Sequence, residues 1–261
     1  MSLIEAIILG IIQGLTEFLP VSSSGHLEIG KHLFGIDAVS SFSFSVAVHG
    51  ATVLSTLVVF RQEVLKLIKG TMKFRMNSET EYVLKILVSM IPVAVTGLFF
   101  EEEIESFFEG NIVFVGFMLL VTAALLIGSH FMKDRRKEIG YFHAFIIGVS
   151  QALAVLPGIS RSGATISAGL MLGNKKENLA RFSFLMVLIP VISANLLKLS
   201  DGDFSSANSV GPGAIIAGFV AAFLTGYLAC RWMVNLVKRG KLYWFGIYCI
   251  LIGLLAIIFA G

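Results

Sequence analysis

Two short stretches of an apolar chain gather the side chains that could do chemistry. Residues 13–26 read QGLTEFLPVSSSGH, and residues 150–165 read SQALAVLPGISRSGAT. Each stretch passes through a proline into small hydroxyl residues and a glycine. Glu17 lies in the first stretch and Arg161 in the second. Charged side chains in such apolar surroundings are costly, so these two are candidate functional residues.

Both stretches are suited to binding an anion. Proline, serine and glycine at a break allow a helix to restart just beyond, with serine side chains capping its free N–H groups. The start of such a helix attracts phosphate, because unpaired donors and the positive end of the helix dipole meet there. Arg161 adds a planar guanidinium fork that matches phosphate oxygens. We expect two facing breaks to surround one phosphate group.

The composition is that of a membrane protein. Charged residues are 14% of the chain and apolar types reach 56%, whereas soluble domains carry about 25% charged residues. The net charge is only +3 and the basic residues are scattered, which argues against nucleic-acid binding. Cys230 and Cys249 lie far apart inside apolar runs, so we expect packing residues and no thiolate metal site.

Apolar stretches set the expected fold. Six of them approach the roughly 20 residues that cross a bilayer. They lie at about 43–60, 83–100, 112–132, 180–199, 212–235 and 241–260. Residues 3–20 and 142–157 each run into a proline and a Ser/Gly-rich segment, which is typical of a re-entrant half-span. The sequence predicts an all-α integral membrane protein with about six transmembrane helices and two re-entrant half-spans.

Lysine and arginine in the connections set the expected orientation. The basic connections, which should be cytoplasmic, are 61–75, 133–137, 175–176 and 238–241. The connections at 101–110 and 200–209 hold no basic residue, so we expect a multi-pass protein with both termini outside the cell. The opening MSLIEAIILG lacks the basic start of a cleavable signal peptide and should be mature structure.

The chain also repeats itself. Residues of the first stretch recur 138 positions later, pairing Gln13, Ser22, Ser24 and Gly25 with Gln151, Ser160, Ser162 and Gly163. Three crossings separate the copies, so the second copy should be inserted upside down. We expect one membrane domain, 1–261, built of two inverted repeats at about 1–132 and 133–261. In such folds the sites form near the midplane, where the interrupted segments meet.

The two stretches closely resemble the signature regions of the undecaprenyl-diphosphate phosphatase family, bacterial enzymes also associated with bacitracin resistance. The resemblance covers nearly the whole chain. It implies a bacterial cell-membrane enzyme that hydrolyses undecaprenyl diphosphate, a polyprenyl diphosphate lipid, to undecaprenyl phosphate and inorganic phosphate, which recycles the lipid carrier for cell-wall synthesis. It also implies a divalent cation, Mg²⁺ or Ca²⁺, and allows a homodimer.

The resemblance assigns roles to particular residues. It implies catalytic roles for Glu17, Ser23, His26 and Arg161, with Glu17 also a metal ligand. It implies substrate binding by Gln13, Ser22, Ser24, Gly25, Ser160, Ser162 and Thr165. Gln13 and Glu17 are four apart and share a helix face. Because residue 13 is an amide, magnesium would be bound by one carboxylate, substrate phosphates and water. Family members commonly carry glutamine at the position of His49, so we expect His49 to be a packing residue.

Several alternatives stay open at this point. The nucleophile could be Ser23 or a water, and the base could be Glu17 or His26. Inverted repeats with broken helices are also common in transporters, so a transporter or flippase of a lipid phosphate is the main alternative function. A non-catalytic receptor for a lipid phosphate is a third. The asymmetry of the two stretches, with Arg161 in only one of them, favours an enzyme.

Overall fold

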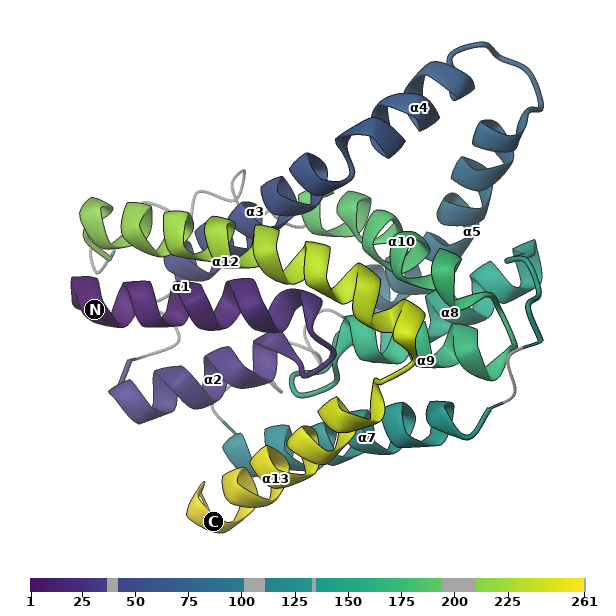
Figure 1. Ribbon diagram of the computed structural model, residues 1–261. Coiled ribbons are helices and arrows are strands. Elements are labelled where there is room, and N and C mark those ends of the chain that lie inside the picture. Colours follow the sequence, from purple (N-terminus) through teal and green to yellow (C-terminus); the bar gives the residue numbers. More distant parts are fainter. Residues whose placement is uncertain (37–41, 101–110, 133–134, 194–209, 261) are drawn as a thin grey trace.

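The computed structural model describes residues 1–36, 42–100, 111–132, 135–193 and 210–260, and within them the named elements are all helices (Figure 1). In chain order the helices are α1 Leu3–Phe18, α2 Ser23–Phe34, α3 Phe42–Val59, α4 Arg61–Thr71, α5 Ser78–Phe99, α7 Ile112–His130, α8 Tyr141–Leu153, α9 Arg161–Met171, α10 Lys176–Met186, α12 Pro212–Arg239 and α13 Tyr243–Ala260. The expected all-α fold is confirmed.

The first expected half-span is a helix, a break and a second helix. Ser2 begins α1 with a capping box that includes Glu5. The helix ends at Phe18, two residues before Pro20, because proline cannot continue the hydrogen-bond ladder. Ser22 has a left-handed φ of 70° and accepts a hydrogen bond from the Gly25 N–H, which starts α2. The break therefore reverses the chain inside the protein.

The second expected half-span has the same local structure. Ser160 precedes α9, and its hydroxyl accepts from the Gly163 N–H. The Thr122 hydroxyl, from α7, donates to the Gly158 carbonyl at 3.0 Å and accepts from the Ser160 N–H at 2.9 Å. These two bonds satisfy backbone groups that the break leaves without helical partners.

The expected number of spans is only partly matched. In the described chain, α5, α7 and α12 are long and apolar enough to cross a membrane, and α3 with α4 adds a fourth if that pair, bent by 76°, is one span. The expected span at 180–199 is interrupted, since α10 ends at Met186, and residues from 194 lie outside the described ranges. The 101–110 and 200–209 connections also lie outside them. The basic connection at 61–75 is mostly helix α4.

Small residues let helices from the two halves pack closely (Figure 1). A Cβ added at Gly10 of α1 would lie 2.4 Å from the Gly218 carbonyl oxygen of α12. A Cβ at Gly148 of α8 would lie 2.2 Å from the Ser89 carbonyl oxygen of α5. Close backbone approach of this kind is how helices associate in membranes. Each interrupted segment therefore packs against a long helix from the other half of the chain.

Candidate active site

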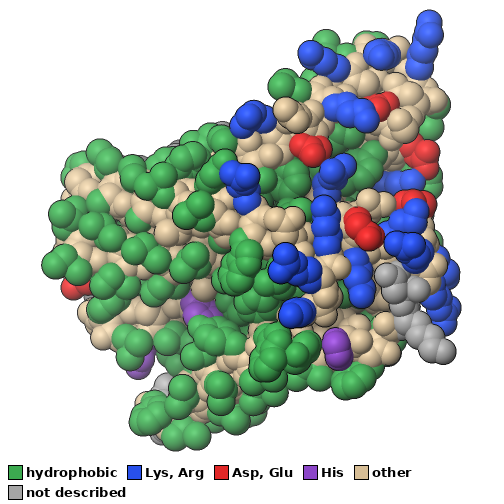
Figure 2. Space-filling view, viewed as in Figure 1, with side chains coloured by type: hydrophobic (Ala, Val, Ile, Leu, Met, Phe, Trp, Pro, Cys, Tyr) green, Lys and Arg blue, Asp and Glu red, His purple; other side chains and the backbone are tan. Residues whose placement is uncertain are grey.

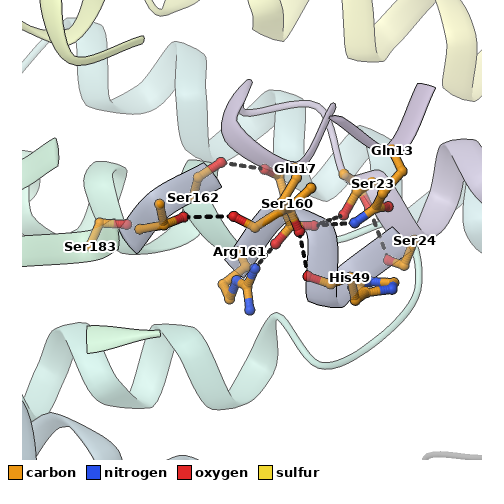
Figure 3. A network of polar contacts seen from close by, with 12 residues as sticks. Gln13, Glu17, Ser23, Ser24, His49, Ser160, Arg161, Ser162 and Ser183 are labelled. Carbon is orange, nitrogen blue, oxygen red and sulfur yellow. Dashed lines mark hydrogen bonds and ion pairs between the residues drawn. The ribbon is translucent and has the colours of Figure 1, made fainter. Parts of the chain in front are cut away.

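The carboxylate of Glu17, in the last turn of α1, is the centre of a polar cluster (Figure 3). Its Oε1 pairs with Nη2 of Arg161, the first residue of α9. Its Oε2 accepts from the Ser23 hydroxyl at 2.6 Å and from the Gln13 amide at 2.9 Å. The Glu17 side chain is only 7% exposed and that of Arg161 is 27% exposed, so the pair is shielded but reachable.

The repeat explains how these groups converge. Ser23 and Arg161 are each the first residue of the helix that restarts after a break. The two helix starts thus present a hydroxyl and a guanidinium to one carboxylate. The Ser162 hydroxyl donates to the Leu19 carbonyl at 3.3 Å, which shows that the two breaks touch. The structure therefore brings together the two segments that the sequence singles out.

The remaining serines and glycines support the breaks. The cap serines each contact a second serine, Ser22 with Ser24 at 3.3 Å and Ser160 with Ser162 at 3.4 Å. A Cβ at Gly25 would lie 3.1 Å from the Gly158 Cα, so Gly25 sits where the two breaks meet.

Thr165 is held away from the carboxylate. Its hydroxyl donates to the Arg161 carbonyl at 2.8 Å and bonds with the Ser183 hydroxyl of α10 at 2.6 Å. Thr165 is 1% exposed. This threonine is therefore placed to fix the start of α9 and, through it, the arginine.

His26 faces another helix. Its Nδ1 lies 2.8 Å from the Ser22 carbonyl oxygen, and its Nε2 lies 2.8 Å from the Tyr248 hydroxyl of α13. The two rings stack with centroids 5.6 Å apart and planes 10° apart. A carbonyl only accepts, so Nδ1 carries the proton and Nε2 of the neutral ring accepts from Tyr248. The hydrogen bonds between described residues thus join Ser23 to Glu17, and His26 to Tyr248.

His49, which we expect to be a packing residue, lies on α3. Figure 3 draws it with the residues of the polar cluster, and its Nδ1 lies 2.8 Å from the Ser45 carbonyl oxygen, one turn earlier in the same helix. A signal for this was present in the sequence. Ser45, His49, Thr52 and Thr56 recur at spacings of four and three along an otherwise apolar segment, which indicates one polar face of a helix.

A cleft opens beside the ion pair. Its polar wall consists of Glu17, Thr52, Thr56, Arg161, Ser162 and Ser183. Its apolar wall consists of Phe18, Val53, Phe184, Val187, Leu188 and Val191. Its lining therefore combines the Glu17–Arg161 ion pair with hydroxyl, aliphatic and aromatic side chains, and its volume is about 20 Å³.

Fold and site together define a helical membrane protein with a buried carboxylate and arginine at the junction of two helix breaks. The chain belongs to the family described as bacitracin resistance protein BacA, whose model matches residues 6–255. It is 56% identical to an undecaprenyl-diphosphatase of Christiangramia forsetii, covering 100% of this chain and 99% of the relative. It is 53% identical to one of Bacteroides fragilis, covering 97% of each chain, and 42% to one of Methanococcus vannielii, covering 98% and 99%. The family resemblance of the two motifs is confirmed.

Proposed function

We propose that this protein hydrolyses undecaprenyl diphosphate to undecaprenyl phosphate and inorganic phosphate. The observation that carries the proposal is the Glu17 carboxylate, which is held between the Ser23 hydroxyl and the Arg161 guanidinium beside a cleft with an apolar wall. Relatives that match the full length of the chain bear the name of this activity. The lining of the cleft supports an amphiphilic substrate, because an ion pair that suits a diphosphate lies among apolar side chains that suit a prenyl chain, although the cleft must widen to admit either.

Phosphoanhydride hydrolysis depends mostly on positioning and on neutralising phosphoryl oxygens. Arg161 has five donors, so its guanidinium can bind phosphate oxygens while one group remains on Glu17. Glu17 already accepts the Ser23 hydrogen bond and is placed to take that proton. Ser23 Oγ then bonds to the terminal phosphorus as the bridging P–O bond breaks, releasing undecaprenyl phosphate. Water cleaves the phosphoserine, which releases inorganic phosphate and restores the hydroxyl.

We also propose that the site uses a divalent cation. Among the described residues no three His, Cys, Asp or Glu side chains gather into a metal group. Gln13 Oε1 is nevertheless buried and has no hydrogen-bond partner, and it belongs to the residue that bonds Glu17. An amide oxygen and a carboxylate are oxygen ligands of the kind Mg²⁺ and Ca²⁺ prefer. Gln13 and Glu17 would hold the ion with substrate oxygens, and the ion would neutralise charge on the diphosphate.

Metal removal tests this assignment. We expect EDTA to abolish phosphate release and added Mg²⁺ or Ca²⁺ to restore it. Gln13→Glu should change the metal concentration for half-maximal rate more than Gln13→Ala does, because it adds a second carboxylate beside the ion. Unchanged turnover after chelation would instead support charge neutralisation by Arg161 and the helix starts alone.

We further propose that the two halves are inverted repeats, with six crossings and both termini outside the cell. The equivalent caps at Ser22 and Ser160 support this, as does the packing of α1 on α12 and α8 on α5. The main alternative, a lipid-phosphate transporter, is separated from an enzyme by one assay. Purified protein in detergent has no second compartment, so phosphate release from undecaprenyl diphosphate there requires catalysis. Binding of the lipid without phosphate release would favour the transporter.

A further inference from the structure

The hairpin formed by α4 and the start of α5 lies outside the proposed active site. The chain bends by 76° after α3, and α4 projects away from the bundle (Figure 1). The turn is built firmly. Asn77 Nδ2 donates to the Gly70 carbonyl at 2.9 Å, and Asn77 Oδ1 accepts from the Thr80 N–H at 2.8 Å, which caps α5. The hairpin is therefore an ordered structure that projects from the bundle.

A basic cleft runs along this hairpin. It has a volume of about 470 Å³ and is lined by Gln62, Leu65, Lys66, Lys69, Gly70, Lys73 and Glu79. Lys66 and Lys69 are three residues apart and share one face of α4, and Lys73 follows in the turn after the helix ends at Thr71. Glu79 is the carboxylate of the cleft and lies 3.4 Å from Lys66. Within the described chain Lys69 and Lys73 form no salt bridge, so the cleft keeps a positive excess.

Large apolar side chains project beside the lysines. Leu65, Ile68 and Met72 are 53%, 50% and 68% exposed, and their spacing places them on the neighbouring helix face. Phe74 follows at the turn and is 94% exposed. Its φ is +50°, a left-handed conformation that a bulky residue rarely adopts. The turn thus holds a phenylalanine ring away from the protein at an energetic cost.

The lysine face and the apolar face of the α4 hairpin together indicate that it lies at a membrane surface. A basic face next to a face of leucine, isoleucine, methionine and phenylalanine is the pattern of a helix that lies in the headgroup region. Figure 2 shows Lys and Arg side chains gathered over α4 and over the end of the bundle next to it. Anionic headgroups are attracted to basic segments at this depth. A soluble phosphate compound would bind the lysines and leave the exposed apolar side chains in water.

We propose that the α4 hairpin binds the phosphate headgroup of an anionic phospholipid. Lys66, Lys69 and Lys73 surround the phosphate in the cleft, while Met72 and Phe74 insert among the upper acyl carbons. The lipid is bound as a structural partner and is not hydrolysed. The proposal is independent of the phosphatase reaction, because none of these residues contacts the Glu17 cluster.

Lipid retention by the full-length protein tests the proposal. The protein is placed in nanodiscs that contain phosphatidylcholine with increasing phosphatidylglycerol, and the enrichment of phosphatidylglycerol around it is measured by mass spectrometry. Each lysine near an anionic surface contributes about fivefold in affinity, so the Lys66→Gln, Lys69→Gln, Lys73→Gln triple variant should lose roughly a hundredfold. Phe74→Ser should weaken retention with no change of charge.

A matched variant controls for total charge. Lys238, Arg239 and Lys241 lie at the turn between α12 and α13, are exposed and belong to the same basic end of the molecule. Changing these three to glutamine removes the same charge and should leave retention near the parent level. An unchanged thermal unfolding midpoint in both triple variants confirms that each is folded.

Two results would overturn the proposal. Equal loss of phosphatidylglycerol in the two triple variants would show a diffuse charge effect without a site. Displacement of the lipid by inorganic phosphate at the same concentration in the parent and in Phe74→Ser would show a site for soluble phosphate. Loss in the α4 variant alone, with salt sensitivity, is the result that the proposal requires.

Discussion

At the scale of single residues, the Glu17 carboxylate is contacted by residues from both halves of the chain. Ser23 and Arg161 hold equivalent places, each at the start of a restarted helix, yet one is a hydroxyl and the other a guanidinium. A repeat with two equal sites would place the same residue at both positions. Divergence at this one position gives the carboxylate a proton donor on one oxygen and a permanent cation on the other. We propose that this arrangement serves phosphoryl transfer, with Ser23 as the nucleophile and Arg161 as the charge stabiliser.

Ser23 is the residue whose loss should be most severe. Ser23→Ala should remove nearly all turnover while substrate still binds, because in the proposed mechanism the hydroxyl forms the covalent bond. Ser24→Ala loses a neutral hydrogen bond to Ser22 and should reduce kcat by about tenfold or less. Single-turnover hydrolysis with a labelled terminal phosphate, quenched early, should reveal phosphoserine. If Ser23→Ala keeps a tenth or more of the parent kcat and no protein is labelled, water is the nucleophile.

Tyr248 should act through His26. Tyr248→Phe removes the hydrogen bond to Nε2, which is worth about 0.5 to 1.5 kcal/mol, so kcat should fall by about two- to tenfold. Nitrogen NMR should show a changed Nε2 shift, because that nitrogen loses its hydrogen bond while Nδ1 still donates to the Ser22 carbonyl. Tyr243→Phe on the same helix is the control, since Tyr243 packs on the His130 ring at 4.8 Å. An Nε2 shift identical to that of the parent would remove Tyr248 from this role.

Site residues that stand in a distinctive local sequence can be predicted, whereas those placed by packing between distant helices cannot. Glu17 and Arg161 are apparent because charge is rare in apolar stretches with proline and serine. Tyr248 gives no such sign, because its role arises from the packing of α13 against α2, across 222 positions of sequence. His49 was expected to be a packing residue, and its Nδ1 lies 2.8 Å from the Ser45 carbonyl oxygen of its own helix.

At the scale of elements, helix breaks are predictable and bends are less so. The breaks fall where the sequence predicts them, because the helix-ending Pro20 and the capping residues Ser22 and Ser160 act locally. The 76° bend before α4 follows no proline or glycine. It falls between the apolar helix α3 and Arg61, the first residue of the basic helix α4. The basic residues at 61–75 were expected to form a connection between spans. They are mostly helix α4, because charged amphipathic helices are common at membrane surfaces.

The crossing of α1 and α12 should be intolerant of added volume. Gly10→Ala would place a Cβ 2.4 Å from the Gly218 carbonyl oxygen, so the helices must separate. Overpacking of this kind costs about 1 to 3 kcal/mol, and the thermal unfolding midpoint in detergent should fall. Gly213→Ala is the control on α12, because nothing lies within 4 Å of the added Cβ. A midpoint that falls equally in both variants would show that the close approach is not what stabilises the pair.

At the scale of the whole molecule, charge asymmetry predicts which end faces the cytoplasm. The described basic residues of the α4 hairpin, the connection after α7 and the turn after α12 gather at one end of the bundle (Figure 2). The N-terminus lies at the opposite end (Figure 1). Positive residues are retained on the cytoplasmic side during insertion, so we expect the basic end to face the cytoplasm and the N-terminus to lie outside the cell.

Thiol labelling in intact cells tests this orientation. Cysteines introduced at Ser2 and Gly211 should react with an impermeant reagent, because they lie at the end predicted to be outside. Cysteines at Arg75 and Lys241 should react only after the cells are opened. The native Cys230 and Cys249 are buried, so the background should be low. Each variant is compared before and after permeabilisation, which separates an inaccessible side from an unreactive thiol. Labelling of Arg75→Cys but not Ser2→Cys in closed cells would invert the orientation and move the lipid-binding hairpin to the outer leaflet.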